Sequence, residues 1–361
     1  MGGTGSGTVT MKTVAEALGV SVTTVSNAYS KPDRLSSALR EQILSKAGEL
    51  GYGGPSAAGR ALRSGKNDVC GFLFGAELSH AFSDPYSVLF LAGLSEAVEE
   101  FGASVLLLRG AGEQEDEAAR LLQRAAIDAL VVCSPADQRR GLELLQGRGV
   151  RVVGTQRTAE GDWVAINDTK AGRLVGKHLA RLGHRDVVVV TSSASRDALE
   201  EFDYRPGRTG AGRPGTFEDE RMRGLAEKLP DARIRVVAAP FHSRASGREA
   251  AGYALDVQDR PTAIVALSDV LAMGVWDAVR ERGLAPGREV SIVGFDDVPD
   301  AGFLGITTVH QPIREKGRLA GRLAFDTELT ERQITLPIEL VVRASSGPAP
   351  SPARVADRQP G

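Results

Sequence analysis

Three polar residues, Gln156, Asp269 and Asp296, each come at or near the end of a short apolar run. The runs VRVVGTQ, TAIVALSD and VSIVGFDD have the continuous apolar character of strands that are buried on both faces. In open parallel sheets, ligands bind beyond the carboxyl ends of the strands. We therefore expect these amide and carboxyl groups to line a ligand pocket.

The sequence contains no recognisable catalytic, metal-binding or cofactor-binding pattern. The histidines are scattered without the spacing of metal ligands, at positions 80, 178, 184, 242 and 310. The G-x-G-x-x-G pattern at 210–215 contains a proline, follows no expected strand and opens no expected helix, which opposes dinucleotide binding. Asp296 and Asp297 are adjacent, so on a strand they would face opposite ways and could not act as a pair. We expect no enzyme, no cofactor and no metal site.

From residue 68 onward, apolar runs alternate with helical patterns. The runs are short and bounded by turn residues, at 69–76, 103–110, 128–135, 150–156, 186–193, 233–240, 262–269 and 290–297. Because helices must cross between parallel strands, this alternation predicts doubly wound parallel sheets of the α/β class. The units are too many for one open sheet, so we expect two linked lobes.

Residues 10–52 contain only helical patterns. Thr10 can cap a helix over about 11–18, Gly19 suits the left-handed residue that ends it, and Ser21 can cap a second helix over about 22–29. A capping box that started at Thr13 would leave only one turn before Gly19.

A third helical pattern over 37–50 follows. Two short helices around a glycine turn and a third helix predict a helix-turn-helix DNA-binding domain, whose second helix enters the major groove by its N-terminal end. Val22, Thr23, Ser26 and Asn27 are expected to point outward from that helix. An ordinary three-helix bundle is the alternative.

The charge, the cysteines and the absence of long apolar stretches restrict the partners and the cellular location of the protein. The net charge of the chain is −2, but residues 1–66 carry +4, which suits attraction to phosphates at one end only. Cys70 and Cys133 lie in apolar runs and are expected to be buried thiols. The chain has no signal-peptide pattern and no apolar stretch near the roughly 20 residues that a membrane helix needs, so we expect a cytoplasmic protein without membrane association.

The segment VAEALGVSVTTVSNAYSKPDRLSSALREQILSKAGELGY resembles the headpiece of the lactose-repressor (LacI/GalR) family along its whole length. The shared elements are V-A-x-x-x-G-V-S-x-x-T-V-S at 14–26, R-x-x-I…A-x-E-L-G-Y at 40–52 and the hinge motif GRALR at 59–63. The resemblance continues to about residue 346, through ERMRG at 220–224 and VSIVGFDD at 290–297 among others. It implies an all-α helix-turn-helix headpiece, a hinge helix and a two-lobe α/β sensor like a periplasmic binding protein.

The resemblance implies which residues contact DNA. We assign this role to Thr10, Ser21, Val22, Thr23, Ser26, Asn27, Arg60, Leu62 and Arg63. Valine and threonine can contact a thymine methyl group, and asparagine can pair with adenine. The resemblance makes Leu62 a wedge in the minor groove, with Arg60 and Arg63 beside it. Two departures are Asn27, where many members have arginine, and Gly59, where alanine is usual and which weakens an isolated hinge helix by about 1 kcal/mol.

The resemblance also implies which residues bind an effector. They are Asp84, Tyr86, Gln156, Arg221, His242, Asp269 and Asp296. Arg221 and Asp296 match the two most regular effector contacts, and a guanidinium opposite a carboxylate suits a ligand rich in hydroxyl groups. The alternatives are a solvated helix charge for Arg221 and a turn carboxylate for Asp296. A lone histidine such as His242 is more often structural than a ligand.

Two stretches depart from the family pattern. Residues 195–219 are longer and richer in glycine, arginine and proline, which predicts either a loop over the cleft or a tolerated insertion. Gly305 and Ile306 stand where a proline usually precedes the LTT-like motif, so the neighbouring crossing between lobes is expected to differ in shape.

The expected organisation is a disordered start, a helix-turn-helix domain, a hinge, an effector-binding and dimerisation domain, and a disordered tail, at 1–9, 10–52, 53–66, 67–346 and 347–361. The first lobe is expected at about 67–165 and 314–335, and the second at about 166–313 and 336–346.

The function expected is that of a homodimeric transcription repressor that binds a pseudo-palindromic operator in double-stranded DNA and is switched by a small-molecule effector. The family favours a sugar or sugar derivative, with a nucleoside or purine second. The competing class, a solute-binding or sugar-modifying protein on the same scaffold, is opposed by residues 10–65. Induction and corepression both stay open.

Overall fold

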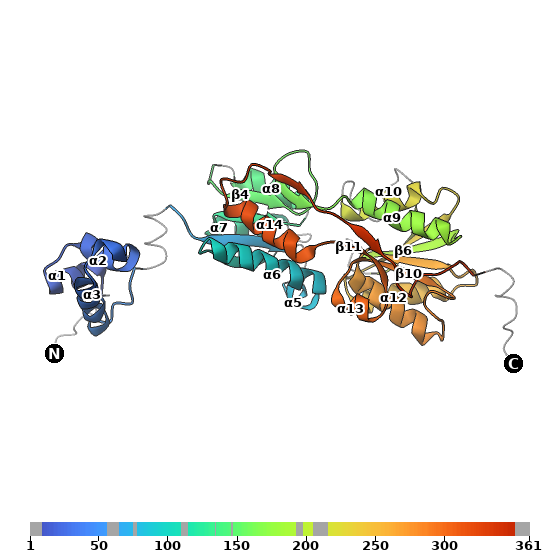
Figure 1. Ribbon diagram of the computed structural model, residues 1–361, viewed down its shortest axis with the longest axis horizontal. Helices are drawn as coiled ribbons and strands as arrows, with labels where there is room; N and C mark the ends of the chain where they lie inside the picture. The colour runs from blue at the N-terminus through green and yellow to red at the C-terminus, as the bar shows by residue number, and fades with distance from the viewer. Residues whose placement is uncertain are drawn as a thin grey trace. The chain divides into compact units, whose positions relative to one another are not determined.

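The computed structural model describes residues 9–55, 65–74, 78–109, 115–133, 135–145, 147–192, 198–204 and 216–350. The chain forms two compact units, Met1–Asn67 and Asp68–Gly361 (Figure 1). The expected hinge contacts Arg60, Leu62 and Arg63 lie outside the described residues.

The N-terminal unit is a small helical domain. Its elements are α1 (Met11–Leu18), α2 (Val22–Ser30), the 3-10 helix η1 (Pro32–Arg34) and α3 (Ser37–Glu49). The Thr10 hydroxyl accepts from the backbone N–H of Thr13 at 3.4 Å, and the backbone N–H of Thr10 donates to the Thr13 hydroxyl at 3.3 Å. The predicted cap at Thr10 is thus confirmed.

The turn between α1 and α2 follows from two residues. Gly19 adopts a left-handed conformation with φ 65°, and Ser21 caps α2 by accepting from the N–H of Thr24 at 3.0 Å. The three helices then share one apolar core, made of Val14, Ala15, Val25, Ala28, Ile43 and Ala47. This core fixes which face of α2 remains at the surface.

The first lobe of the C-terminal unit is built on a parallel sheet with the strand order β12-β5-β4-β3-β1-β2. The strands are β1 (Val69–Phe74), β2 (Ser104–Arg109), β3 (Ala129–Val132), β4 (Arg151–Gly154), β5 (Asp162–Ala165) and β12 (Gln333–Thr335). The helices of this lobe are α5 (His80–Ser83), α6 (Pro85–Glu100), α7 (Glu115–Arg124), α8 (Pro135–Leu145) and α14 (Ile313–Phe325).

The second lobe is built on a sheet with the strand order β13-β11-β10-β9-β6-β8-β7. Its strands are β6 (Asp186–Ser192), β7 (Glu200–Asp203), β8 (Arg233–Ala239), β9 (Ala263–Ala266), β10 (Ser291–Asp296), β11 (Thr307–His310) and β13 (Glu339–Val341). The edge strands β7 and β13 are antiparallel to their neighbours and the others are parallel. The helices are α9 (Asp168–Arg181), α10 (Phe217–Glu227), α11 (Arg244–Leu255), α12 (Asp269–Glu281) and α13 (Pro299–Phe303).

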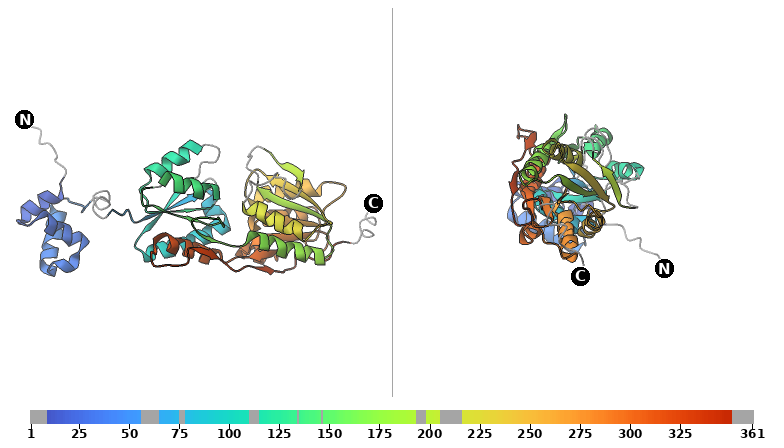
Figure 2. Two further views of the ribbon diagram at one scale, coloured as in Figure 1. Left: turned by 90° about the horizontal axis from the view of Figure 1, so that it is seen from above. Right: turned by 90° about the vertical axis from the view of Figure 1, so that its right-hand side faces the viewer.

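The chain crosses between the lobes three times, after β5, after β11 and after β12. The returning helix α14 packs on α6, and β12 pairs with β5, before β13 joins β11 in the second sheet. Figure 2 shows this C-terminal part in orange and red, passing along both sheets. The predicted α/β class with doubly wound parallel sheets is confirmed.

Two sequence expectations are corrected. Residues 200–203, inside the expected loop or insertion at 195–219, form the edge strand β7, because their backbone groups pair with β8. Residues 347–350, expected to be disordered, are bound to the second lobe: the N–H of Gly347 donates to the Ser291 hydroxyl at 3.0 Å, and that of Ala349 to the Leu182 carbonyl at 2.8 Å.

Glycines bring the helix pair α9 and α10 into backbone contact. A Cβ atom on Gly172 would lie 2.0 Å from the carbonyl oxygen of Arg221, and one on Gly224 would lie 2.1 Å from that of Thr169. Since real Cβ atoms do not approach so closely, the spacing of this pair requires glycine at both positions. The packing sets the position of Arg221 along α10.

Within the described residues, no helix has both the length and the apolar character needed to cross a membrane.

Candidate effector-binding and DNA-binding sites

The start of α2 presents the residues expected to contact DNA. Ser21, Val22 and Thr23 are exposed, and Ser26 and Asn27 are half-buried on the same helix. Val22 is 46% exposed although it is apolar, because the domain core takes up Val25 and Ala28 instead. The outward position expected for Val22 and Thr23 is thus confirmed, whereas contact of these residues with DNA stays a prediction. Thr10 is exposed at the start of α1.

Arg221 on α10 is buried and is held by hydrogen bonds and by two aromatic rings. Its Nε donates to Asp168 Oδ1 at 2.8 Å and its Nη1 donates to the carbonyl oxygen of Leu267 at 2.6 Å. The guanidinium carbon lies 4.7 Å from the ring centroid of Phe217 and 4.5 Å from that of Phe295. Burial alone would lower the pKa of Arg221, but the Asp168 and Asp296 carboxylates raise it above its ordinary value. Arg221 is therefore a fixed cation, not a solvated helix charge.

Asp296 ends β10 in a backbone conformation that is rare for a non-glycine residue, with φ 120°. Its Oδ1 accepts from Gln311 Nε2 at 2.7 Å and its Oδ2 accepts from the N–H of Asp269 at 3.3 Å. Burial raises the pKa of Asp296 to about 7, although Arg221 acts in the opposite direction. This carboxyl group can therefore accept or donate hydrogen bonds near neutral pH.

Asp269 is fully buried, with 0% exposure. Its Oδ1 accepts from the Thr308 hydroxyl at 2.7 Å and its Oδ2 accepts from the N–H of Val298 at 3.0 Å. Burial, together with the neighbouring Asp296 carboxyl, raises the pKa of Asp269 well above its ordinary value. Both oxygens thus accept hydrogen bonds from the chain that follows β10, and the role of Asp269 as an effector contact stays a prediction. The backbone N–H of Asp269 also donates to Asp296, so Asp269 contacts that carboxyl group directly.

Asp84 and Tyr86 lie at the start of α6 in the first lobe. Asp84 caps this helix, with Oδ2 accepting from the Ser87 N–H at 3.0 Å and from the Ser87 hydroxyl at 2.6 Å. The Tyr86 hydroxyl accepts from Lys316 Nζ at 3.1 Å, and burial raises the pKa of Tyr86 well above its ordinary value. The Asp84 carboxylate is thus partly used by its own helix, whereas Tyr86 connects α6 with α14.

His242 follows β8, and its ring meets that of His80 edge to face at 5.7 Å between centroids. Burial lowers the pKa of His242 to about 4, against the effect of Asp84. The imidazole is therefore neutral at pH 7 and offers an aromatic surface.

Five of the expected effector residues are brought together across the two lobes. Arg221 and Asp296 act on the pKa of Tyr86, Asp84 and Arg221 act on that of His242 and on that of Asp296, and we call these five residues the effector cluster. Such convergence of buried charged and aromatic groups is typical of a binding site. Gln156 is placed differently, since its amide nitrogen donates to the Cys133 carbonyl at 2.7 Å.

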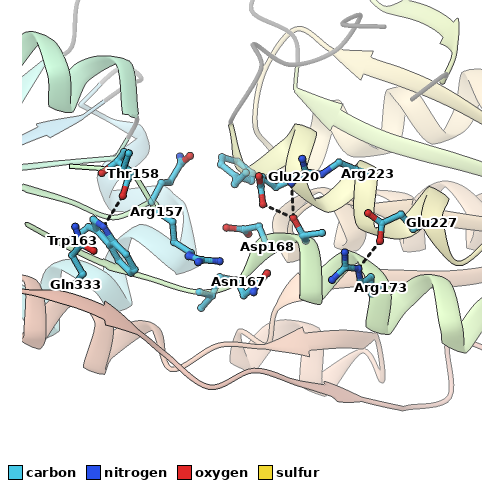
Figure 3. A pocket seen from close by; sticks show the side chains of 15 residues that line it. Arg157, Thr158, Trp163, Asn167, Asp168, Arg173, Glu220, Arg223, Glu227 and Gln333 are labelled. Carbon is cyan, nitrogen blue, oxygen red and sulfur yellow. Dashed lines mark hydrogen bonds and ion pairs between the residues drawn. The ribbon is translucent and has the colours of Figure 1, made fainter. Parts of the chain in front are cut away.

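A pocket of about 790 Å³ lies between residues 156–163 of the first lobe and the helices α9 and α10 (Figure 3). The side chains of Arg157 and Trp163 from the first lobe face those of α9 and α10 across it, and Gln156 also lines it. Asp168 and Phe217 line the pocket and also contact Arg221, so they join the pocket to the cluster.

Sequence reasoning did not single out Asp168, Trp163, Gln311 or Lys316. Asp168 could have been found, because it belongs to the ND-x-x-AG motif at the predicted start of a helix. Lys316 gives no such signal, since it stands in a helix of mixed charge where lysine is ordinarily solvated.

A helix-turn-helix domain followed by a two-lobe domain with a buried polar site defines the class of DNA-binding regulators that carry a ligand-binding domain. The chain belongs, more specifically, to the lacI family of bacterial regulatory proteins. The model of that family matches residues 10–54, and that of the periplasmic binding protein-like domain matches residues 177–346.

The sequence similarity to curated relatives extends over nearly the whole chain. An HTH-type transcriptional regulator of Mycolicibacterium smegmatis is 36% identical over 354 residues, which cover 94% of this chain and 96% of the relative. The HTH-type transcriptional repressor PurR of Edwardsiella ictaluri is 29% identical over 345 residues, which cover 92% of this chain and 94% of the relative. The relatives are transcription regulators and not enzymes, as expected from the sequence.

Solved structures share the fold. A LacI-family transcriptional regulator from Corynebacterium glutamicum is similar with a TM-score of 0.65 and 26% identity, over 94% of this chain and all of that one. The Lac repressor dimer bound to operator and the anti-inducer ONPF gives a TM-score of 0.71 at 21% identity, over 94% and 99%. The regulator CelR in complex with cellobiose is similar with a TM-score of 0.61 and 23% identity. The match covers 94% of this chain and 100% of CelR.

Proposed function

We propose that the protein is a repressor that binds a pseudo-palindromic operator as a homodimer and releases or retains it according to a sugar-like effector. The observation that carries this proposal is the effector cluster with buried Arg221 and Asp296, whose Arg221 contacts two residues, Asp168 and Phe217, that line a pocket of about 790 Å³. The protein acts in the cytoplasm, where the DNA of a bacterium lies.

The exposed start of α2 supports operator reading. A recognition helix places its first residues against base edges, and Val22, Thr23 and Asn27 carry groups that fit thymine methyl and adenine edges. The hinge residues Arg60 and Leu62 are proposed to contact the minor groove next to the base that α2 reads.

The chemistry of the cluster favours a sugar or sugar derivative. A guanidinium and a carboxyl group can each hold two adjacent oxygens, which neighbouring hydroxyl groups of a sugar provide. His242 and Tyr86 supply aromatic surface beside them. The related fold of CelR is known with cellobiose, which agrees with this choice.

A nucleoside or purine is the second effector class. It is favoured by the relatives named PurR, which match over most of this chain. The aromatic side chains of Phe217 and Phe295 are already occupied by Arg221, which leaves fewer surfaces for stacking a base.

Exposed apolar side chains support a homodimer. Phe82 and Val88 lie at the start of the first lobe's helices, and Phe241 and Tyr253 lie before and on α11, all between 47% and 70% exposed. Exposed apolar side chains that gather into a patch often mark an interface, and two-fold dimers are the commonest assemblies. Sedimentation should give twice the chain mass of 38.1 kDa, and Val88→Glu should shift it toward the monomer.

The experiment that tests DNA reading selects operator sequences from a random pool with the full chain and then measures their affinity. Asn27→Ala should weaken the selected operator about tenfold and relax the sequence preference at one base pair, because one bidentate contact is lost. The control Gln42→Ala changes an exposed residue of α3 and should leave both quantities unchanged. Equal losses on operator and random DNA for Asn27→Ala would contradict the recognition role.

A further inference from the structure

Lys316 is a buried lysine on α14, in the part of the chain that returns to the first lobe. It is only 6% exposed, and its Nζ donates to the Tyr86 hydroxyl at 3.1 Å. The ammonium also lies 5.8 Å from the centroid of the Tyr86 ring. Both contacts point the side chain toward the effector cluster.

The Lys316 ammonium has no ion-pair partner in the described part of the chain. No carboxylate oxygen there lies within 4.0 Å of Nζ, whereas the neighbouring buried cation Arg221 is paired with Asp168 at 2.8 Å. A lysine ammonium has three N–H donors, and the Tyr86 hydroxyl takes one of them. The other two can bind a ligand.

The surroundings of Lys316 are those of the cluster and its pocket. Burial lowers its pKa, while the Asp168 and Asp296 carboxylates act to raise it and Arg221 acts to lower it further. Asp168 also lines the pocket described above (Figure 3). The ammonium is therefore close to groups that we assign to effector binding.

A buried charge without a counter-ion is unfavourable, and proteins keep such charges where they have a task. We infer that Lys316 binds an acidic group of the effector, a phosphate ester or a carboxylate carried by a polyhydroxylated molecule. This inference rests on the proposed function, in which the cluster holds the hydroxyl groups of a sugar. Lys316 then selects a charged sugar derivative over the neutral sugar.

A measurement without ligand comes first. Lys316→Met keeps the length of the side chain and removes the charge, so the full chain should melt a few degrees higher in buffer that lacks phosphate and other polyvalent anions. Lys177→Met, on the exposed face of α9, is the matched control and should not change the melting temperature. A lower melting temperature for Lys316→Met would overturn the inference, because it would make the lysine a stabilising part of the fold.

Inorganic phosphate is the next probe. At equal ionic strength, replacing chloride by phosphate should stabilise the wild type and Lys177→Met more than Lys316→Met. Any binding of phosphate to the basic N-terminal unit is the same in all three and cancels. Equal stabilisation of the three proteins would overturn the inference.

Matched ligands then identify the acidic group and separate this inference from the proposed function. Glucose, glucose 6-phosphate and glucuronate, and ribose with ribose 5-phosphate, are titrated into wild type, Lys316→Met and Asp296→Asn. The inference predicts that an acidic member binds at least tenfold tighter than its neutral partner and loses that advantage in Lys316→Met. Preference for the phosphates indicates a phosphate ester, and preference for glucuronate a sugar acid.

Two other results are informative. An acidic sugar that keeps its advantage over its neutral partner in Lys316→Met, or that has no such advantage in the wild type, while Asp296→Asn binds neither sugar, would overturn the role of Lys316 and leave the proposed effector site standing. Binding that is equal in all three proteins would contradict the proposed site itself.

Discussion

At the scale of single residues, Arg221 and Asp168 are the clearest example of a site that is also a structural feature. Both are nearly buried, and they form a direct ion pair at 2.8 Å. Two charges in a low-dielectric interior are tolerable only together, since each alone would lose its water without compensation. The pair is therefore expected to respond to substitution as a unit.

Arg221→Met should lower the free energy of unfolding of the full chain by about 3–5 kcal/mol, because it leaves the Asp168 carboxylate buried and uncompensated. The double variant Arg221→Met with Asp168→Asn should be more stable than Arg221→Met alone. Urea unfolding of the wild type, both single variants and the double variant gives the coupling energy. Additive losses would show that the pair does not act as a unit.

Asp296 supplies a prediction on pH. Its pKa in the folded protein is about 7, above the ordinary 3.8, so between these values the folded state holds a proton that the unfolded state has released. The stability that this group contributes is present below pH 3.8 and is lost as the pH rises to 7.

Asp296→Asn removes this titration. The free energy of unfolding of the wild type should therefore fall relative to that of Asp296→Asn when the pH rises from 4 to 7. The low pKa of His242 acts in the opposite direction but is present in both proteins, so the difference between the two curves reports Asp296 together with Asp269, whose pKa Asp296 raises. Parallel curves over this range would contradict the raised pKa.

At the scale of elements, the sequence predicted what short-range patterns determine. The apolar runs gave the central strands, and the cap residues Thr10 and Ser21 gave the ends of α1 and α2. It did not predict β7 or β12, because these edge strands are short and partly exposed and acquire their structure only by pairing with distant segments.

The residues of the candidate site also divide into those that the sequence could predict and those that it could not. Arg221 and Asp296 could be expected from the family resemblance, and the cluster unites them. The buried position of Asp269 and of Lys316 could not be expected, since burial depends on which elements pack around a residue. Asp269 is buried because α12, which it begins, packs against β10. A Cβ atom on Gly294 of β10 would lie 2.2 Å from Asp269 Oδ1.

The close packing of α9 and α10 links an element to the site. Gly172→Ala would place a Cβ atom 2.0 Å from the Arg221 carbonyl oxygen, so α10 must move and take Arg221 with it. We expect lower stability and weaker effector binding, measured by thermal unfolding and calorimetry.

Gly48→Ala on α3 is the matched control, because it also changes a helical glycine but has nothing within 4 Å of the new Cβ. It should stabilise its helix by about 1 kcal/mol and leave effector binding unchanged. If both substitutions had the same effect, the close contact between α9 and α10 would not control the site.

At the scale of the whole molecule, the chain joins two compact units with separate tasks. A ligand can change DNA binding only to the extent that it prefers one of the states that bind or release DNA. The effector cluster contains side chains from both lobes, so a ligand there is placed to favour one arrangement of the lobes over another. Whether that arrangement holds or releases the operator determines corepression or induction.

The most direct test of this account is the affinity of the full chain for its selected operator, with and without saturating effector, measured by fluorescence anisotropy. The effector should change the operator Kd of the wild type by about tenfold or more, in either direction. Asp296→Asn should bind the operator as well as the wild type does but should not respond to the effector. An effector that binds at the cluster and leaves the operator Kd of the wild type unchanged would contradict the account.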